Sequence, residues 1–366
     1  MLALGSADRA PWWSVQTSGL DTDLRGVSVV FTAVGNGKYY AIWASGSNGV
    51  ILRSEDEGRH WKQIAVKGAG ALDFRDIEAL DADSAYVMSS GDGDKSRIYK
   101  TKDGGAHWDL QYSDKRAGFF LDSLACDSGT HCVALSDPVD GKFVVLGTND
   151  GEHWKELPRE KMPAALPKEG AFAASGTAIA LCGYRDDKKI VFGTGGPAAR
   201  IFRSTDAGQT WTVSEIPIAA GNASSGIFSI ACYDDDLVAV GGDYKEPGKS
   251  KAVAAYSDDG GDHWHLAVVQ PGGYRSAVAA FSQQDFAAVG INGTDVSHDK
   301  GVHWQHTEFL NLNAVGFHGQ EGWTVGPKGT IARFKTHWEY QIRNRLPADG
   351  PEWSLGADVA GAKSTR

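Results

Sequence analysis

The stretch SDDGGDHW at residues 257–264 carries the pattern Ser/Thr-x-Asp-x-Gly-x-x-Trp, called the box below, and this pattern decides the fold. It recurs as SEDEGRHW at 54–61, TKDGGAHW at 101–108, STDAGQTW at 204–211 and SHDKGVHW at 297–304. In a degenerate copy, GTNDGEHW at 147–154, Gly147 and Asn149 take the Ser and Asp positions, while Gly151 and Trp154 are kept. Successive box tryptophans lie 40 to 57 residues apart, about the length of one four-stranded propeller blade.

The box predicts a structural hairpin rather than a catalytic site. Its Asp can accept hydrogen bonds from backbone N–H groups of its own turn, helped by the Ser or Thr hydroxyl. Its Gly allows a positive φ, and its Trp packs back into the sheet. A His precedes several box tryptophans, but one His per blade around a rim cannot converge on a metal ion. The predicted structural aspartates are Asp56, Asp103, Asp206, Asp259 and Asp299.

Each box follows a segment whose alternating small and apolar residues suit the innermost strand of a blade. These segments are 24–29, 74–80, 120–126, 170–176, 226–232, 274–281 and 312–317. There are seven of them for six boxes, and the last unit lacks an outer strand, which PWWSVQTS at 11–18 can supply. We therefore predict an all-β, seven-bladed β-propeller over residues 12–338, with four-stranded antiparallel blades and a ring closed by the N-terminal strand. Residues 1–11 are interpreted as a leader or stub, and residues 339–366 as a flexible or loosely docked tail.

Composition excludes several function classes. The net charge is −10 and no long basic run occurs, which argues against nucleic-acid binding. No stretch approaches the roughly 18 to 20 consecutive apolar residues of a membrane-spanning helix. No P-loop, dinucleotide fingerprint or metal-ligand spacing is found, so we expect no cofactor and no metal. We expect a monomer.

The four cysteines are too few for a disulfide scaffold. Cys126 and Cys132 flank a short turn in an expected hairpin. They could form a cross-strand disulfide in an oxidising compartment or remain buried thiols, and the sequence leaves both open.

The boxes resemble the Asp-box (BNR) repeats of sialidases, sortilin-type receptors and many other propellers. More specifically, WASGSNGVILRSEDEGRHW at 43–61 and GWTVGPKGTIARF at 322–334 resemble the Ycf48-like photosystem II assembly factors. This resemblance covers most of residues 12–338. It implies a non-enzymatic, exported chaperone, periplasmic or extracellular, that binds a partner protein through a propeller face carrying arginines, although no signal peptide is visible in this chain.

A propeller gathers the first residues of its inner strands and the loops between its second and third strands at one mouth of the channel, the default ligand site. Three arginines there, in a chain of net charge −10, suit a carboxylate-bearing ligand or a protein segment. The alternative is that each Arg pairs with a neighbouring acid such as Asp76 or Asp122 and merely closes the channel. The predicted ligand-binding residues are Arg25, Arg75, Arg275, Asp122, Tyr244 and Tyr274.

The other hypothesis is a carbohydrate-active enzyme, a glycoside hydrolase or lyase of the broad Asp-box type. Such an enzyme needs two carboxylates facing one cavity, about 5 to 9 Å apart. The candidates are Asp137, Glu169 and Asp243, with aromatic side chains nearby for sugar stacking. The Arg-Ile-Pro segment typical of sialidases is absent. A cavity that holds two acids walled by aromatics would favour the enzyme, and an arginine-lined surface would favour the binder.

Overall fold

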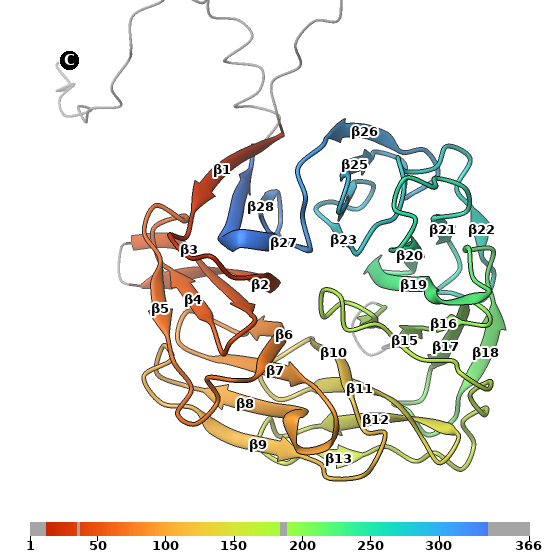
Figure 1. Cartoon of the computed structure of the whole chain (residues 1–366), viewed down its shortest axis with the longest axis horizontal. Coiled ribbons are helices and arrows are strands. Elements are labelled where there is room, and N and C mark those ends of the chain that lie inside the picture. The colour runs from red at the N-terminus through yellow and green to blue at the C-terminus, as the bar shows by residue number, and fades with distance from the viewer. Residues whose placement is uncertain (1–11, 35–36, 184–188, 336–366) are drawn as a thin grey trace, which may run out of the picture.

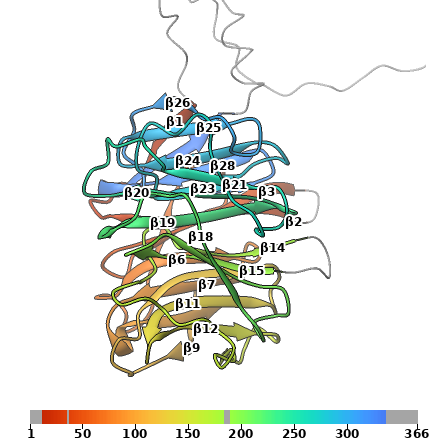
Figure 2. The same cartoon turned by 90° about the vertical axis from the view of Figure 1, so that its right-hand side faces the viewer.

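Seven antiparallel sheets stand around a central axis (Figure 1), and Figure 2 shows the same ring from its side. The computed structural model describes residues 12–34, 37–183 and 189–335. The expected leader, 1–11, and tail, 339–366, lie outside these ranges. Each sheet has four strands, and one gains a short fifth strand, so the predicted seven-bladed, all-β fold is confirmed. Only two 3-10 turns, Gly93–Lys95 and Pro327–Gly329, interrupt the strands among the described residues.

We number the blades 1 to 7 in chain order and give their strands from the axis outward. Blade 1 consists of β2 (Leu24–Val34), β3 (Gly37–Gly46), β4 (Ile51–Ser54) and β5 (Lys62–Ile64). Blade 2 consists of β6 (Asp73–Ala79), β7 (Ala85–Ser90), β8 (Arg97–Thr101) and β9 (Asp109–Ser113). Blade 3 consists of β10 (Leu121–Cys126), β11 (Cys132–Val139), β12 (Lys142–Thr148) and β13 (Lys155–Glu156). Blade 4 consists of β14 (Ile179–Cys182), β15 (Lys189–Gly193), β17 (Arg200–Ser204) and β18 (Thr212–Glu215). Blade 5 consists of β19 (Asn222–Tyr233), β20 (Asp236–Asp243), β21 (Ala254–Ser257) and β22 (His265–Leu266), and the short β16 (Gly195–Gly196) pairs with β19 as its fifth strand. Blade 6 consists of β23 (Ala277–Ala280), β24 (Phe286–Gly290), β25 (Gly293–Ser297) and β26 (Gln305–Glu308). Blade 7 consists of β27 (Ala314–His318), β28 (Glu321–Val325), β29 (Thr330–Phe334) and β1 (Trp13–Thr17).

The N-terminal strand closes the ring, as predicted. β1 pairs antiparallel with β29 from Trp13↔Phe334 to Thr17↔Thr330. The buried Trp13 indole donates to Thr294 Oγ1 of blade 6 at 2.9 Å. β1 thereby covers the outer edge of β29 and completes the four-stranded sheet of blade 7.

The apolar core is divided among the contacts between blades. Each of seven buried clusters in the described residues combines side chains from two adjacent blades, for example Trp43 of blade 1 with Phe74 of blade 2. Because the bulky residues are used between blades, the inner strands can present small and polar side chains to the axis. This division leaves the channel mouth available for a binding site.

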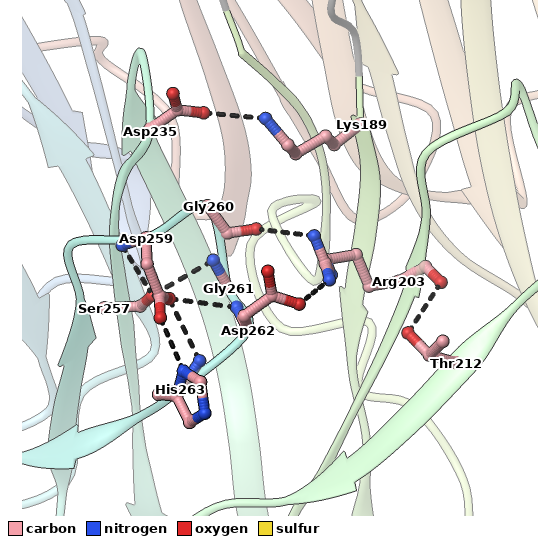
Figure 3. A network of polar contacts seen from close by, with 10 residues as sticks. All are labelled: Lys189, Arg203, Thr212, Asp235, Ser257, Asp259, Gly260, Gly261, Asp262 and His263. Atoms are coloured by element: carbon pink, nitrogen blue, oxygen red, sulfur yellow. Dashed lines mark hydrogen bonds and ion pairs between the residues drawn. The ribbon is translucent and has the colours of Figure 1, made fainter.

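The box of blade 5 shows how the hairpin is fixed (Figure 3). Asp259 Oδ1 accepts from Ser257 Oγ at 2.8 Å and from the backbone N–H of His263 at 2.9 Å, and Asp259 Oδ2 lies 2.6 Å from His263 Nδ1. The Gly261 N–H donates to Ser257 Oγ at 3.0 Å. The boxes around Asp56, Asp103, Asp206 and Asp299 repeat this arrangement, with Thr210 in place of His in the Asp206 box. The His side chains therefore bind their own box Asp.

The degenerate box differs from its sequence interpretation. Thr148 and Asp150, rather than Gly147 and Asn149, fill the Ser and Asp roles: Thr148 Oγ1 donates to Asp150 Oδ1 at 3.1 Å, and the Gly151 N–H donates to Thr148 Oγ1 at 2.9 Å. The copy is thus a box with one residue deleted between Asp and Gly. Its Asp still accepts from the backbone N–H of His153 at 2.8 Å, but the buried Trp154 Nε1 has no acceptor among the described residues.

The predicted inner strand at 170–176 is wrong. The inner strand of blade 4 is β14, Ile179–Cys182, and residues 170–178 instead run across the channel mouth (the yellow-green loop inside the ring in Figure 1). In this segment Ser175 Oγ donates to Ser276 O of blade 6 at 2.8 Å, and Gly176 O accepts from Ser123 of blade 3. These side-chain bonds, together with isolated backbone bridges at Gly170 and Gly176, replace the strand pairing that the pattern predicted.

The cysteines form two disulfides. Cys126 and Cys132 lie directly opposite each other on β10 and β11, which resolves the alternative that the sequence left open. The second bridge, Cys182–Cys232, was not predicted and joins the inner strands of blades 4 and 5. It therefore ties two blades covalently close to the axis.

Candidate binding site

A cavity of about 430 Å³ occupies the channel mouth. Every blade or the connection leading into it contributes to its wall, as expected for the first residues of the inner strands. Its lining consists of Arg25, Arg75, Phe120, Ala171, Phe172, Ala173, Ala174, Phe228, Tyr244, Tyr274, Ser276, Ile291 and Asn313.

Local backbone irregularities aim the lining residues. The pairing register of the inner strands shifts between Leu24 and Gly26 and between Phe74 and Asp76, so Arg25 and Arg75 are bulged residues. The same shift occurs around Phe228 in blade 5. A β-bulge leaves one residue unpaired and redirects its side chain, and all three of these residues line the cavity. Asp122 lies at the equivalent shift of blade 3 but is buried, so the bulge alone does not decide the direction.

Arg25 and Arg75 form the cationic side of the cavity, each with its side chain 26% exposed. Arg25 lies 3.4 Å from Asp23 Oδ2, whereas Arg75 Nε donates to Asp73 Oδ2 at 2.6 Å and its Nη1 donates to Ala173 O at 2.8 Å. Burial lowers the pKa of Arg25, and the neighbouring Arg75 lowers it further. The Arg25 Nε atom is buried without an acceptor among the described residues. Both side chains thus remain partly exposed at the cavity despite their neighbouring acids.

The opposite side of the cavity is aromatic. Phe172 stacks on Phe228 with ring centroids 3.8 Å apart, and Tyr274 meets Phe228 edge-on at 4.8 Å. Tyr244 stands 6.5 Å from Tyr274 and is 41% exposed. Burial raises the pKa of Tyr274, so its hydroxyl stays protonated at neutral pH. Of the predicted ligand residues, Arg25, Arg75, Tyr244 and Tyr274 are therefore brought together.

Arg275 is not at the cavity, in contrast to its predicted place. Its side chain is fully buried, its Nε donates to Asp295 Oδ2 at 2.6 Å, and its Nη1 donates to Asn292 Oδ1 at 2.6 Å. The inner strand of blade 6 begins two residues later, at Ala277, and pairs without a register shift. Tyr274 consequently faces the cavity in place of Arg275.

Asp122 is also displaced from the predicted site. It is almost completely buried and does not line the cavity. Burial raises its pKa well above the ordinary range, and the nearby Asp137 adds to the rise. A neutral carboxyl here would not oppose an anion bound nearby.

The three candidate acids of an enzyme do not share one cavity. Asp137 and Glu169 line a separate hollow of about 580 Å³ that has no aromatic side chain in its wall. Glu169 is held by Arg200 and by Thr194 Oγ1 at 2.6 Å, and Asp137 Oδ1 accepts from the Ala171 N–H at 2.9 Å. Burial raises the pKa of Asp137 to about 6. Asp243 lines neither space; burial acts to raise its pKa, but hydrogen bonds from Ser224, the Lys245 N–H and Asn222 outweigh that effect and lower it.

Other polar residues near the mouth fasten adjacent blades. Asp76 Oδ2 accepts from the Leu124 N–H of blade 3 at 2.7 Å, so Asp76 is not the partner of an arginine. Asn313 Nδ2 donates to Leu24 O of blade 1 at 2.8 Å. These contacts bring the inner strands together and fix the positions of the cavity walls.

Sequence reasoning missed the crossing segment, whose Phe172 and Ala173 form part of the cavity wall. A signal was present: the 57 residues between Trp154 and Trp211 are the longest interval between boxes, which indicates extra chain before blade 4.

In the described ranges, no group of three or more His, Cys, Asp or Glu side chains could hold a metal ion. The same ranges contain no helix long and apolar enough to cross a membrane.

Comparisons with known proteins agree with this architecture. Photosystem II assembly lipoprotein Ycf48 of Synechococcus sp. (strain CC9902) is 24% identical over 222 residues, which is 61% of this chain and 57% of that protein. The match thus spans less than two thirds of the length of this curated relative.

Two solved structures share the fold. A structure of YCF48 bound to D1 peptide superposes with a TM-score of 0.61 at 14% identity, covering 89% of this chain and 98% of that one. YCF48 from Cyanidioschyzon merolae gives a TM-score of 0.61 at 16% identity, covering 89% and 99%. Residues 6–287, more than half of the chain, match the family described as DUF6242 beta propeller domain. The protein belongs to the DUF6242 beta propeller domain family.

Proposed function

We propose that this propeller is a non-catalytic binding and assembly protein that holds a segment of a partner protein at the channel mouth, with a carboxylate between Arg25 and Arg75. One observation carries the proposal: in a chain of net charge −10, the mouth cavity is lined by two arginines and by no acidic residue. A planar guanidinium matches a carboxylate in two parallel hydrogen bonds. The cavity volume of about 430 Å³ falls in the range of pockets that take a few residues or a small ligand.

Two similarities support the class of function. One relative is named an assembly lipoprotein, and one structural neighbour was solved with a bound peptide. An extracytoplasmic location is part of the proposal, because disulfides persist in oxidising compartments and the described chain contains two.

The carbohydrate-active alternative has less support. The mouth cavity has aromatic walls but no carboxylate in its lining, whereas the hollow with Asp137 and Glu169 has carboxylates but no aromatic wall. A glycosidase needs two available acids in one sugar-binding cavity. Glu169 is fully engaged by Arg200 and Thr194.

Selection from a random nine-residue peptide library displayed on phage tests the proposal. We expect the wild-type protein to enrich peptides with Asp or Glu, and the Arg25→Glu/Arg75→Glu variant to lose this enrichment at least tenfold. The matched control is Arg59→Glu/Lys102→Glu, which reverses two exposed charges in box loops. Acidic enrichment that survives reversal of Arg25 and Arg75, or that disappears equally in the control, contradicts the proposed site.

A further inference from the structure

Three exposed apolar side chains lie on loops beside the aromatic side of the mouth. Tyr244 follows β20, Ile291 lies between β24 and β25, and Phe309 follows β26; they are 41%, 40% and 84% exposed. A side chain as large as Phe is seldom left so exposed without a binding role when other apolar residues lie beside it. Tyr244 and Ile291 also line the mouth cavity, so the apolar surface continues from the cavity onto blades 5 and 6.

Hydrogen bonds fix these loops to one another. The Leu312 N–H donates to Gly290 O at 3.2 Å, which holds the chain after Phe309 beside the Ile291 turn. Asn292 Nδ2 and the Tyr274 N–H both donate to Pro247 O, at 2.9 and 3.0 Å, which ties the loop after Tyr244 to blade 6. The Phe309 ring rests on His306 with centroids 4.6 Å apart. The loops that carry the three apolar side chains are therefore held in fixed positions, which lowers the entropy cost of binding.

The cationic side of the mouth has no such surface. Arg25 and Arg75 have the partly exposed, acidic side chains of Asp23 and Asp73 beside them. The exposed Phe31 of blade 1 lies six residues along β2 from Arg25, roughly 20 Å toward the opposite face. The mouth thus has two different sides, with charged side chains over blades 1 and 2 and apolar ones over blades 5 to 7.

We propose that Tyr244, Ile291 and Phe309 form an apolar shelf that receives a bulky apolar side chain of the same partner segment whose carboxylate lies between Arg25 and Arg75. This inference rests on the proposed function. A cavity of about 430 Å³ is about 9 Å across if it is round, and extended chain advances about 3.3 Å per residue. The occupant is therefore an extended peptide segment with an acidic residue and, two to four positions away, a large aliphatic or aromatic residue.

The same peptide library tests the shelf. Peptides enriched by the wild-type protein should pair an acidic residue with an apolar one at that spacing. Replacing the apolar residue by Ser in a synthetic, fluorescein-labelled copy should weaken binding about tenfold for the wild type, measured by fluorescence anisotropy. For the Phe309→Ser variant the same replacement should change binding less than about twofold. Leu110→Ser, a change at an exposed apolar residue on the outer strand β9, is the matched control and should behave like the wild type.

The outcomes separate the two proposals. Acidic enrichment that depends on Arg25 and Arg75 but shows no apolar partner, or an apolar preference that survives Phe309→Ser, overturns the shelf and leaves the proposed function in place. Acidic enrichment that does not depend on the arginines removes both.

Discussion

Aspartates on the rim and aspartates near the channel mouth have opposite electrostatic environments. Burial alone would raise the pKa of the rim residue Asp259, but hydrogen bonds from His263 and Ser257 outweigh it and lower the pKa to about 2. Near the mouth, burial raises the pKa of Asp137 to about 6 and that of Asp122 well above its ordinary range. The surroundings of an Asp therefore favour its charged form at the rim and shift it toward the neutral form inside. Hydrogen-bond donors and burial, not residue type, decide which form is favoured.

Because of this difference, the two kinds of Asp change the stability of the protein with pH in opposite ways. A rim Asp with a lowered pKa contributes stability that is present above about pH 4 and is lost as the pH falls toward 2. An interior Asp with a raised pKa binds its proton more tightly in the folded state, so stability is lost as the pH rises from about 4 to 6. The rim aspartates should therefore lower the stability of the folded state as the pH falls below about 4, and the interior aspartates should lower it as the pH rises above about 4.

Removing the rim carboxylate should have the largest effect. Asp259→Ala deletes the acceptor of two backbone N–H groups and of the Ser257 hydroxyl, so we expect the free energy of unfolding at pH 7 to fall by about 2–3 kcal/mol. Urea unfolding measures it. Asp258→Ala, at an exposed neighbour, is the control and should change stability by less than about 0.5 kcal/mol. The Asp259→Ala curve should also be flatter than the wild type between pH 4 and 2; an unchanged acid limb would contradict the rim assignment.

Removing the interior carboxyl should have the opposite pH dependence. The Asp137→Asn side chain can still accept from the Ala171 N–H but cannot ionise. Relative to the wild type, the variant should gain about 1–2 kcal/mol between pH 4 and pH 8, less than the full 1.4 kcal/mol per pKa unit because the carboxyl is only partly buried. Urea unfolding at both pH values measures the gain. If wild type and variant keep the same difference at both pH values, Asp137 does not carry a raised pKa.

The rim was predictable from the sequence, whereas much of the interior was not. A box is a local motif: its donors and acceptors lie within eight residues, so residue spacing alone predicts its hydrogen bonds. The closing strand was likewise visible, because 11–18 reads like the strand that follows a box. The shortened copy was misassigned because it was aligned by Trp154, which hid the one-residue deletion before Gly151.

The interior depends on contacts between blades that no local pattern reports. Arg25, Arg75 and Arg275 occupy similar sequence positions, but only the first two lie at a bulge, and Arg275 is neutralised by Asp295 on a strand two positions further out. Residues 170–176 alternate like a strand, yet their partners lie in blades 2, 3, 5 and 6. The arginines and tyrosines of the cavity were predictable; its wall from the crossing segment was not.

Contacts between rim and neighbouring blade offer the smallest and most specific test. Arg203 on β17 of blade 4 reaches the blade 5 box, where it contacts Asp262 and donates to Gly260 O at 3.3 Å (Figure 3). Arg53, Lys100 and Arg203 each directly precede a box Ser or Thr, and Lys100 reaches the next box in the same way, donating to Gly151 O at 2.7 Å. A cation at this position therefore links consecutive blades.

A double-mutant cycle with Arg203→Met and Asp262→Ala should give a coupling energy of about 0.5 kcal/mol, because Asp262 is more than half exposed and the ion pair is screened by water. Unfolding in low and high salt measures it, and the coupling should shrink as salt is added, since exposed charges are screened. A coupling of zero at low salt would mean that the Arg203–Asp262 ion pair does not help to hold blades 4 and 5 together.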